Sequence, residues 1–223
     1  MYDVQVDKSI YYSRKYFTPE RFATYYAQIK AVNSNSPKNV LEIGVGDKTV
    51  SNYLSGLGIQ TTTFDFDENL NPDVVGDLRE GLPFDDNTFD SVCAFEVLEH
   101  MPYDIFQKNL RELLRVSNNQ VIISIPYTCI SFEFMFKFRT TLFHSLRRKF
   151  NKQIYVPVKI PAFTKDIDIN DNGQHYWELG SRGYSKRRVR NDIQKECEIL
   201  REYHCYQSPA HYFYELRKTN VAE

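Results

Sequence analysis

The sequence predicts an α/β protein with a doubly wound sheet of seven strands, mostly parallel, that ends in an antiparallel hairpin. Three observations lead to this prediction. Short apolar runs alternate with segments of helical spacing along much of the chain, which is typical of βαβ units and a parallel sheet. The first run, residues 39–43, breaks into a glycine turn before a helix. Near the end, residues 198–206 and 211–217 are strand-like and separated by a short Ser-Pro turn, which predicts a hairpin.

The first predicted helix begins at Thr18-Pro19-Glu20, with a hydroxyl at the N-cap, proline at the first helical position and an acid in the first turn. Its apolar face is formed by Phe22, Tyr25, Tyr26 and Ile29. Further helices are predicted from Val50 onward, over residues 105–116 and over residues 185–196. The other central strands are predicted over residues 60–66, 73–75, 89–95 and 120–125.

The length of 223 residues predicts one domain, 1–223, with residues 1–36 as an N-terminal helical lid and 127–183 as an insertion on the substrate side. The start of the chain has neither a basic region nor a long apolar stretch, and no run approaches the roughly 18 apolar residues of a membrane span. A cytoplasmic protein is therefore expected. The four cysteines form no CxxC pair, so we expect reduced thiols and no metal site.

The glycine turn, EIGVGDKT, favours a ligand other than a dinucleotide or an isolated phosphate. Gly44 and Gly46 allow a ligand to approach the backbone, but a third glycine is absent because Thr49 occupies its position. Glu42, at the end of the strand, would repel a pyrophosphate and suits a cation. Alternatively, Glu42 pairs with a lysine and the glycines serve only as a turn.

Acids also follow the next predicted strands. Asp65 ends the second strand at about the place where an acid binds ribose hydroxyls in nucleotide-binding α/β folds. Asp77 follows the third strand, and the segment CAFEVLEHMP ends the fourth. The carboxyl ends of these strands meet at one edge of a doubly wound sheet, which is where such folds bind ligands.

These motifs together resemble those of class I S-adenosylmethionine-dependent methyltransferases, which have a Rossmann-like fold. The resemblance covers about residues 40–126 and includes the E-x-G-x-G turn and a D-x-x-x-LPF-x-x-x-[ST]FD…EVLEH signature. It implies that S-adenosyl-L-methionine is the cofactor. It also implies that the methionine part, the ribose, the adenine and the floor beside the sulfonium are bound by Glu42, Gly44, Gly46, Asp65, Phe66, Asp77, Leu78, Phe95 and Glu96. Lys48 departs from the family pattern, which often has a small residue there.

Methyl transfer to oxygen requires a group that removes a proton, and histidine is a natural base near neutral pH. Three residues are candidates for contact with the acceptor. His175 lies in GQHYWELG at the end of the insertion, His100 in EVLEH after the fourth strand, and Tyr127 directly after the fifth. The alternatives are an aromatic packing corner for His175, organisation of a loop for His100 and a position over the sheet edge for Tyr127.

The insertion carries a basic stretch without acids from residue 134 to 165. Phe132, Met135, Phe138, Leu142 and Leu146 have helical spacing, which predicts an amphipathic helix that packs on the domain, closes over an anionic acceptor or meets an acidic membrane surface. No RNA-binding signature is present, so nucleic acid is disfavoured as a partner. The oligomeric state is not predicted.

The predicted function is O-methylation, ahead of N-methylation, of a small or glycan-like acceptor that is anionic or lipid-linked. Segments similar to HYWE occur in relatives that resemble surface-polysaccharide methyltransferases, which implies a saccharide as one class of acceptor. The alternative is a non-catalytic module of the same fold that binds a partner or an anionic membrane through the basic insertion.

Overall fold

The computed structural model of the protein describes residues 7–14, 16–138, 152–161, 165–167, 174–205, 208 and 210–218. The α-helices are α1 (Lys8–Tyr11), α2 (Pro19–Asn33), α3 (Thr49–Gly56), α4 (Phe106–Val116) and α7 (Lys186–Gln194). Short 3-10 helices are η1 (Glu68–Leu70), η2 (Leu78–Glu80), η3 (Leu98–His100) and η4 (Tyr103–Ile105). The strands are β1 (Asn39–Ile43), β2 (Gln60–Asp65), β3 (Val74–Val75), β4 (Phe89–Phe95), β5 (Ser117–Pro126), β6 (Cys129–Phe138), β7 (Lys152–Pro161), β8 (Cys197–His204) and β9 (His211–Lys218).

Within the described residues, the main sheet has seven strands in the order β3-β2-β1-β4-β5-β9-β8. β1, β2, β3, β4 and β5 pair in parallel, and β9 is antiparallel to both β5 and β8. The order reverses at β1, where β2 lies on one side and β4 on the other, so this is the switch point at which doubly wound sheets bind ligands. The predicted sheet with its C-terminal antiparallel hairpin is confirmed.

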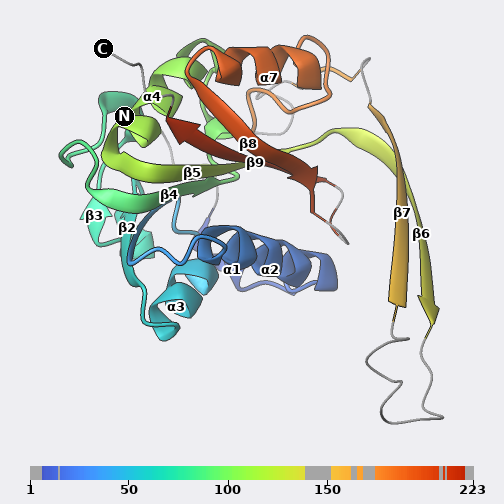
Figure 1. Ribbon diagram of the computed structural model, residues 1–223, viewed down its shortest axis with the longest axis horizontal. Helices are drawn as coiled ribbons and strands as arrows, with labels where there is room; N and C mark the ends of the chain where they lie inside the picture. Colours follow the sequence, from blue (N-terminus) through green and yellow to red (C-terminus); the bar gives the residue numbers. More distant parts are fainter. Residues whose placement is uncertain are drawn as a thin grey trace.

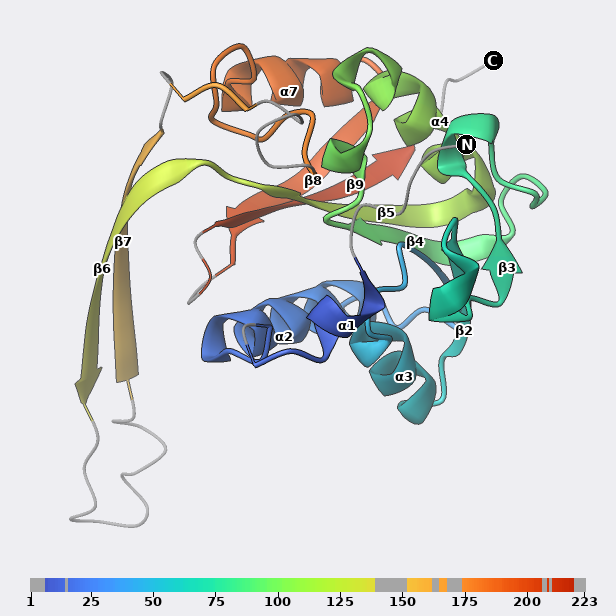
Figure 2. The same cartoon turned by 180° about the vertical axis from the view of Figure 1, so that it is seen from behind.

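Two apolar layers cover the sheet. In Figures 1 and 2, α1, α2 and α3 lie against one face, and α4 and α7 lie against the other. The α4 and α7 side buries Leu110, Leu113, Val189 and Ile193 in one core cluster, and the α2 and α3 side buries residues such as Val32 and Leu54 in a second. The helical periodicity of these segments explains why each helix presents an apolar stripe to the sheet. No helix within the described segments is both long and apolar enough to cross a membrane.

The insertion differs from its prediction. The expected amphipathic helix is wrong where the structure describes this part of the chain, because residues 129–138 form β6 and pair antiparallel with β7. Leu142 and Leu146, which were expected on the same helix, lie outside the described residues. β6 leaves the domain directly after β5, and the two-stranded β6–β7 ribbon projects from the rest of the molecule (Figures 1 and 2).

A period of two rather than 3.6 organises β6. Ile130, Phe132, Phe134 and Phe136 alternate along the strand, so their side chains emerge on one face. They stand opposite Ile160, Val158, Val156 and Ile154 of β7. Helical spacing accounted for only some of the apolar residues of this segment. The alternation of the strand accounts for Ile130, Phe132, Phe134 and Phe136, each of which lies opposite an apolar residue of β7.

Candidate functional site

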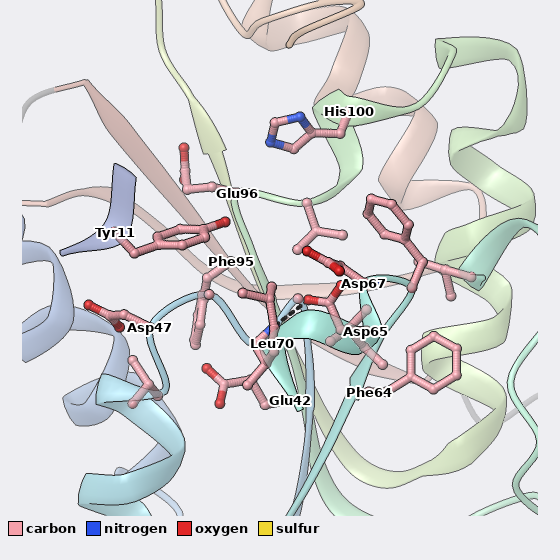
Figure 3. A pocket seen from close by; sticks show the side chains of 18 of the residues that line it. Tyr11, Glu42, Asp47, Phe64, Asp65, Asp67, Leu70, Phe95, Glu96 and His100 are labelled. Atoms are coloured by element: carbon pink, nitrogen blue, oxygen red, sulfur yellow. Dashed lines mark hydrogen bonds between the residues drawn. The ribbon is translucent and has the colours of Figure 1, made fainter. Parts of the chain in front are cut away.

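A pocket opens at the carboxyl ends of β1, β2 and β4. Its volume is about 400 Å³, which is in the range of small-molecule sites. The glycine turn and Glu42 line it, and Figure 3 shows Glu42 and His100 at opposite ends of the view, with Glu96 to one side. The pocket therefore lies where the strand order reverses.

The glycine turn requires its glycines. Gly44 has φ +79° and Gly46 φ +50°, both in the left-handed region that favours glycine. A Cβ on Gly44 would also lie 2.4 Å from Cγ2 of Val97, so the loop after β4 closes against the turn. Lys48, the departure from the family pattern, has φ +63° and begins α3, and its Nζ donates to the carbonyl of Asn71. Its backbone conformation explains why a small residue is common at this position.

Glu42 gives the pocket a buried acid. The residue is 4% exposed, and its Oε2 has no hydrogen-bond partner among the described residues. Burial, with Asp47 and Asp65 nearby, raises the pKa of Glu42 to about 8, although hydrogen bonds from Ser51 oppose the shift. A buried carboxyl group with an unsatisfied oxygen favours a cationic or hydrogen-bond-donating ligand beside it. The residues present therefore fit the amino group and the sulfonium of S-adenosylmethionine.

Asp65 and Asp77 follow neighbouring strands and take different local partners. Asp65 Oδ2 accepts the backbone N–H of Val45 at 2.8 Å, and its Oδ1 accepts that of Asp67 at 2.9 Å. Asp65 therefore fixes the glycine turn to the end of β2. Asp77 Oδ2 forms an ion pair with an Nη atom of Arg79 at 2.6 Å. Burial alone would raise the pKa of Asp77. The hydrogen bonds and the charge of Arg79 together have the larger effect, so the pKa is lowered. Both aspartates line the pocket.

The motifs EVLEH and HYWE, distant in sequence, are joined by three hydrogen bonds. His100 Nδ1 lies 2.8 Å from the Gln174 carbonyl, and the backbone N–H of Tyr176 donates to the Glu99 carbonyl at 2.8 Å. Trp177 Nε1 donates to the Met101 carbonyl at 3.2 Å. Trp177 is fully buried against the aromatic rings of Tyr103 and Phe106, so it anchors this contact.

The contact brings two histidines together at the pocket wall. The rings of His100 and His175 meet edge to face with their centroids 4.9 Å apart. His175 Nδ1 lies 2.7 Å from Glu178 Oε1, and Thr128 Oγ1 donates to the other Glu178 oxygen. Burial, together with the neighbouring His175, lowers the pKa of His100 to about 4, so its ring is neutral near pH 7. Glu178 therefore holds the His175 ring in one orientation.

The pocket brings together most residues that the sequence singled out. The predicted residues that line it are Glu42, Gly44, Gly46, Asp65, Phe66, Asp77, Leu78, Phe95, Glu96, His100 and His175. Tyr127 does not line it: the Tyr127 ring packs against His204 and Tyr212 within the core, so its expected contact with the acceptor is not supported.

Other pocket residues were missed by sequence reasoning. The N-terminal segment contributes Tyr11, Tyr16, Arg21 and Tyr25, and the Tyr25 hydroxyl donates to Asp47 at 2.7 Å. The sequence contained one signal for these residues: several tyrosines lie before residue 36, in the segment 1–36 that was expected to form a lid over the pocket. His211 of β9 also lines the pocket, with Nε2 3.7 Å from Glu96 Oε2. No local pattern identifies His211, because it reaches the site only through the β5–β9 pairing.

Comparison with known proteins finds a methyltransferase domain in this chain. Residues 41–125 match the model of a methyltransferase domain family. Among solved structures, the chain is similar to the N-methyltransferase NodS from Bradyrhizobium japonicum, with bound S-adenosylhomocysteine (TM-score 0.57, 9% identity, 92% of this chain and 90% of that chain covered). It is also similar to 1,6-didemethyltoxoflavin-N1-methyltransferase from Burkholderia thailandensis, again with S-adenosylhomocysteine (TM-score 0.58, 14% identity, 96% and 87% covered).

A third similar structure is an S-adenosylmethionine-dependent methyltransferase from Clostridium acetobutylicum (TM-score 0.57, 11% identity, 95% and 97% covered). A search of curated proteins found no match. At these identities the solved structures establish the fold, and the matched domain contains the glycine turn, Asp65, Asp77 and EVLEH. Residues 41–125 therefore match a methyltransferase domain, and the chain has the fold of these S-adenosylmethionine-dependent methyltransferases.

Proposed function

We propose that the protein transfers a methyl group from S-adenosylmethionine to an oxygen atom of a small or glycan-like acceptor. The observation that carries this proposal is His175, which lines the pocket and whose Nδ1 lies 2.7 Å from Glu178 Oε1. A histidine whose Nδ1 is held by a carboxylate can take a proton at Nε2. The match to a methyltransferase domain disfavours the alternative of a non-catalytic module.

The cofactor would lie along the glycine turn. Glu42 with the backbone of Gly44 and Gly46 would hold its methionine part, Asp65 and Phe66 its ribose, and Asp77 and Leu78 its adenine. Phe95 and Glu96, at the end of β4, would form the floor beside the sulfonium. The burial of Glu42 and the amide contacts of Asp65 support these assignments, because both acids are fixed before a ligand arrives.

The reaction requires few protein groups. The acceptor oxygen attacks the methyl carbon in line with the sulfur, the new C–O bond forms, and the C–S bond breaks with its electron pair passing to sulfur. The hydroxyl proton passes to Nε2 of His175. Most of the acceleration comes from alignment of the two reactants and exclusion of water. Tyr11, Tyr16 and Tyr25 of the N-terminal lid line the pocket and would restrict water there.

Cofactor binding provides the first test. Asp65→Ala and Asp77→Ala should each weaken binding of S-adenosylhomocysteine by about 1–3 kcal/mol, because each loses charged or buried hydrogen bonds. Calorimetry measures the change. Asp90→Ala is the matched control, since Asp90 holds the Lys38 backbone N–H at the start of β4 and does not line the pocket. Undiminished affinity in both pocket variants would contradict the proposed cofactor site.

Turnover provides the second test. A panel of hydroxyl and amine acceptors is assayed for formation of S-adenosylhomocysteine, and a hydroxyl acceptor is expected to react. With that acceptor, His175→Ala should lower kcat by about 10²–10⁴-fold while affinity for S-adenosylhomocysteine is kept. Wild-type turnover in His175→Ala would end the role of His175, and reaction of amine acceptors alone would establish N-methylation instead.

The β6–β7 ribbon supports an anionic membrane surface as the location of the acceptor. On one face, the exposed fractions of Ile130, Phe132, Phe134 and Phe136 are between 55% and 64%, and those of the opposite β7 residues are between 43% and 57%. The sequence from 134 to 165 adds bases and no acid: Lys137, Arg139, Arg147, Arg148, Lys149, Lys152, Lys159 and Lys165. Exposed apolar side chains in a segment whose sequence is basic suit anionic lipid, where each base near the surface contributes about 1 kcal/mol.

A second copy of the chain suits this face less well. A second copy carries the same basic sequence, and like charges repel. A lipid surface carries the opposite charge. A lipid-linked acceptor is therefore favoured over a freely diffusing one.

Vesicle sedimentation tests the membrane contact. Phe132→Ser with Phe134→Ser should abolish binding to anionic vesicles, while Tyr53→Ser, which alters an exposed ring on α3, should leave it unchanged. Equal binding to neutral vesicles would argue against the role of the basic residues. A dimer in sedimentation velocity that the ribbon variant dissociates, without vesicle binding by the wild type, would identify a second copy as the occupant.

A further inference from the structure

We propose that Glu99, His100 and His175 bind a divalent transition-metal ion at the acceptor side of the pocket. The sequence predicted no metal site, because the cysteines form no ligand motif and the two histidines lie 75 positions apart. The fold joins EVLEH to HYWE and so brings these side chains together. Metal binding itself does not depend on the proposed reaction, but the catalytic role given to the ion below rests on it.

The three side chains are spaced for a single ion. One ligand atom from each lies within 4.8 Å of the others. Nitrogen and oxygen ligands about 2.0–2.2 Å from a tetrahedral zinc ion lie about 3.3–3.6 Å from one another, so the side chains would move together by about 1 Å to close the set. His100 and His175 line the pocket, whereas Glu99 is fully buried behind them, so an ion would enter from the pocket.

Both histidines have the second contact that metal-binding imidazoles have. His100 Nδ1 donates to the Gln174 carbonyl at 2.8 Å, and His175 Nδ1 is held by the Glu178 carboxylate at 2.7 Å. A carbonyl oxygen can only accept, so the His100 proton is on Nδ1 and its Nε2 carries the lone pair. With the His175 proton on Nδ1 toward Glu178, the same holds for His175. A carbonyl or carboxylate partner of this kind fixes the ring orientation and raises the basicity of the ligand nitrogen.

Glu99 provides the independent observation. Its exposed fraction is 0%, and neither carboxylate oxygen has a hydrogen-bond partner among the described residues. A buried acid with no bonded donor is costly to a fold, and a bound cation supplies the missing partner.

The ligand set indicates the class of metal. Two imidazole nitrogens and one carboxylate suit Zn²⁺ and other first-row divalent ions rather than Mg²⁺ or Ca²⁺, which favour oxygen ligands. Three protein ligands leave a coordination position for the acceptor. An ion there would bind the acceptor hydroxyl and lower its pKa, so that its proton would pass to solvent water before methyl transfer, in place of transfer to His175. His175 would then act as a metal ligand, and the favoured acceptor would be a hydroxyl compound able to bind a metal.

The experiment measures metal binding directly. The purified protein is treated with chelator and titrated with Co²⁺, followed by visible absorption, and with Zn²⁺, followed by calorimetry. We expect one equivalent of either ion to bind. Glu99→Gln and His175→Ala should lower the affinity at least about 100-fold, and Glu178→Gln about 10–100-fold because it removes only the outer contact. His204→Ala is the control, since His204 lies on β8 and does not line the pocket.

Binding of S-adenosylhomocysteine is measured on every variant as a check of folding. If the wild type binds S-adenosylhomocysteine but neither metal, or if Glu99→Gln and His175→Ala keep the wild-type metal affinity, the metal site is overturned and the proposed function stands. If one equivalent of metal binds but S-adenosylhomocysteine does not, the proposed function fails and the metal site stands.

Discussion

β5 and β6 follow each other in the chain and are both rich in apolar residues, yet they have opposite surroundings. Val121, Ile122, Ile123 and Ile125 of β5 are at most 1% exposed, because β4 and β9 flank the strand and helices cover both faces. Alternate residues of β6 are more than half exposed, because the strand pairs only with β7. Apolar content alone therefore does not identify the core. The strand neighbours and the covering helices decide whether an apolar side chain stabilises the fold or is available for contact with another surface.

The largest expected effect comes from matched substitutions in these two strands. Ile123→Ala should lower the free energy of unfolding by about 2–5 kcal/mol, since it removes buried methyl groups and leaves a cavity. Phe134→Ala, although it removes more atoms, should change it by less than about 0.5 kcal/mol because the ring is 55% exposed. Urea unfolding measures both values. Equal losses would mean that the ribbon face is covered in solution.

Buried and less buried acids should also differ in how they affect stability. Glu42 is buried with a pKa of about 8, so the cofactor-free protein should lose stability as pH rises from about 4.5 to 8, by a few kcal/mol at most. The unfolded chain releases this proton above about pH 4.5, whereas the folded protein holds it until about pH 8. Glu42→Gln should remove this part of the pH dependence of Tm.

Asp90 is the exposed counterpart. Hydrogen bonds, first from the Lys38 backbone N–H, lower the pKa of Asp90, so its contribution to stability is present above the usual pKa of 3.8 and is lost only as pH falls below it. Asp90→Asn should therefore leave the slope of Tm between about pH 5 and pH 9 unchanged. A Glu42→Gln profile parallel to that of the wild type would show that Glu42 is ionised when buried.

Gly44 and Gly58 both have a left-handed backbone conformation, but only Gly44 has a close neighbour at the place of a Cβ. Gly44→Ala should lower the free energy of unfolding by about 1–3 kcal/mol, since it places a Cβ against Val97 at a left-handed φ. Gly58→Ala has a similar φ of +83° but open space around the new Cβ, so only the backbone strain of about 1–2 kcal/mol remains. Thermal unfolding measures the difference. A larger loss in Gly58→Ala would contradict a close contact between the glycine turn and the loop after β4.

The smallest expected effect is at Lys48. Lys48→Gly relieves a left-handed backbone but removes the hydrogen bond from Nζ to the Asn71 carbonyl, so the net change should be below about 1 kcal/mol. The affinity for S-adenosylhomocysteine should be unchanged, because Lys48 does not line the pocket. Calorimetry and urea unfolding check the two statements. Tighter cofactor binding by the glycine variant would mean that Lys48 obstructs the site.

The sequence by itself determined the sheet and the residues at the carboxyl ends of β1, β2 and β3 that line the pocket. Alternation of apolar runs with helical segments predicts the strand and helix order, and the motifs at the strand ends lie close in the sequence to the elements that hold them. Glu42, Gly44, Gly46, Asp65 and Asp77 therefore needed no information from distant parts of the chain. Local patterns were sufficient because the glycine turn and the strand ends are local structures.

Only the tertiary structure decided the contact between His100 and His175 at the pocket wall, and the ribbon. His175 reaches His100 through hydrogen bonds that join segments far apart in sequence, and Tyr127 turns into the core rather than toward the pocket. β6 has an apolar alternation that the helical spacing of Phe132, Met135 and Phe138 concealed, and its pairing with β7 decides between the two. The physical reason is the same in each case. Hydrogen bonds and contacts between distant segments depend on the packed chain, and a local pattern cannot specify which partner a side chain meets.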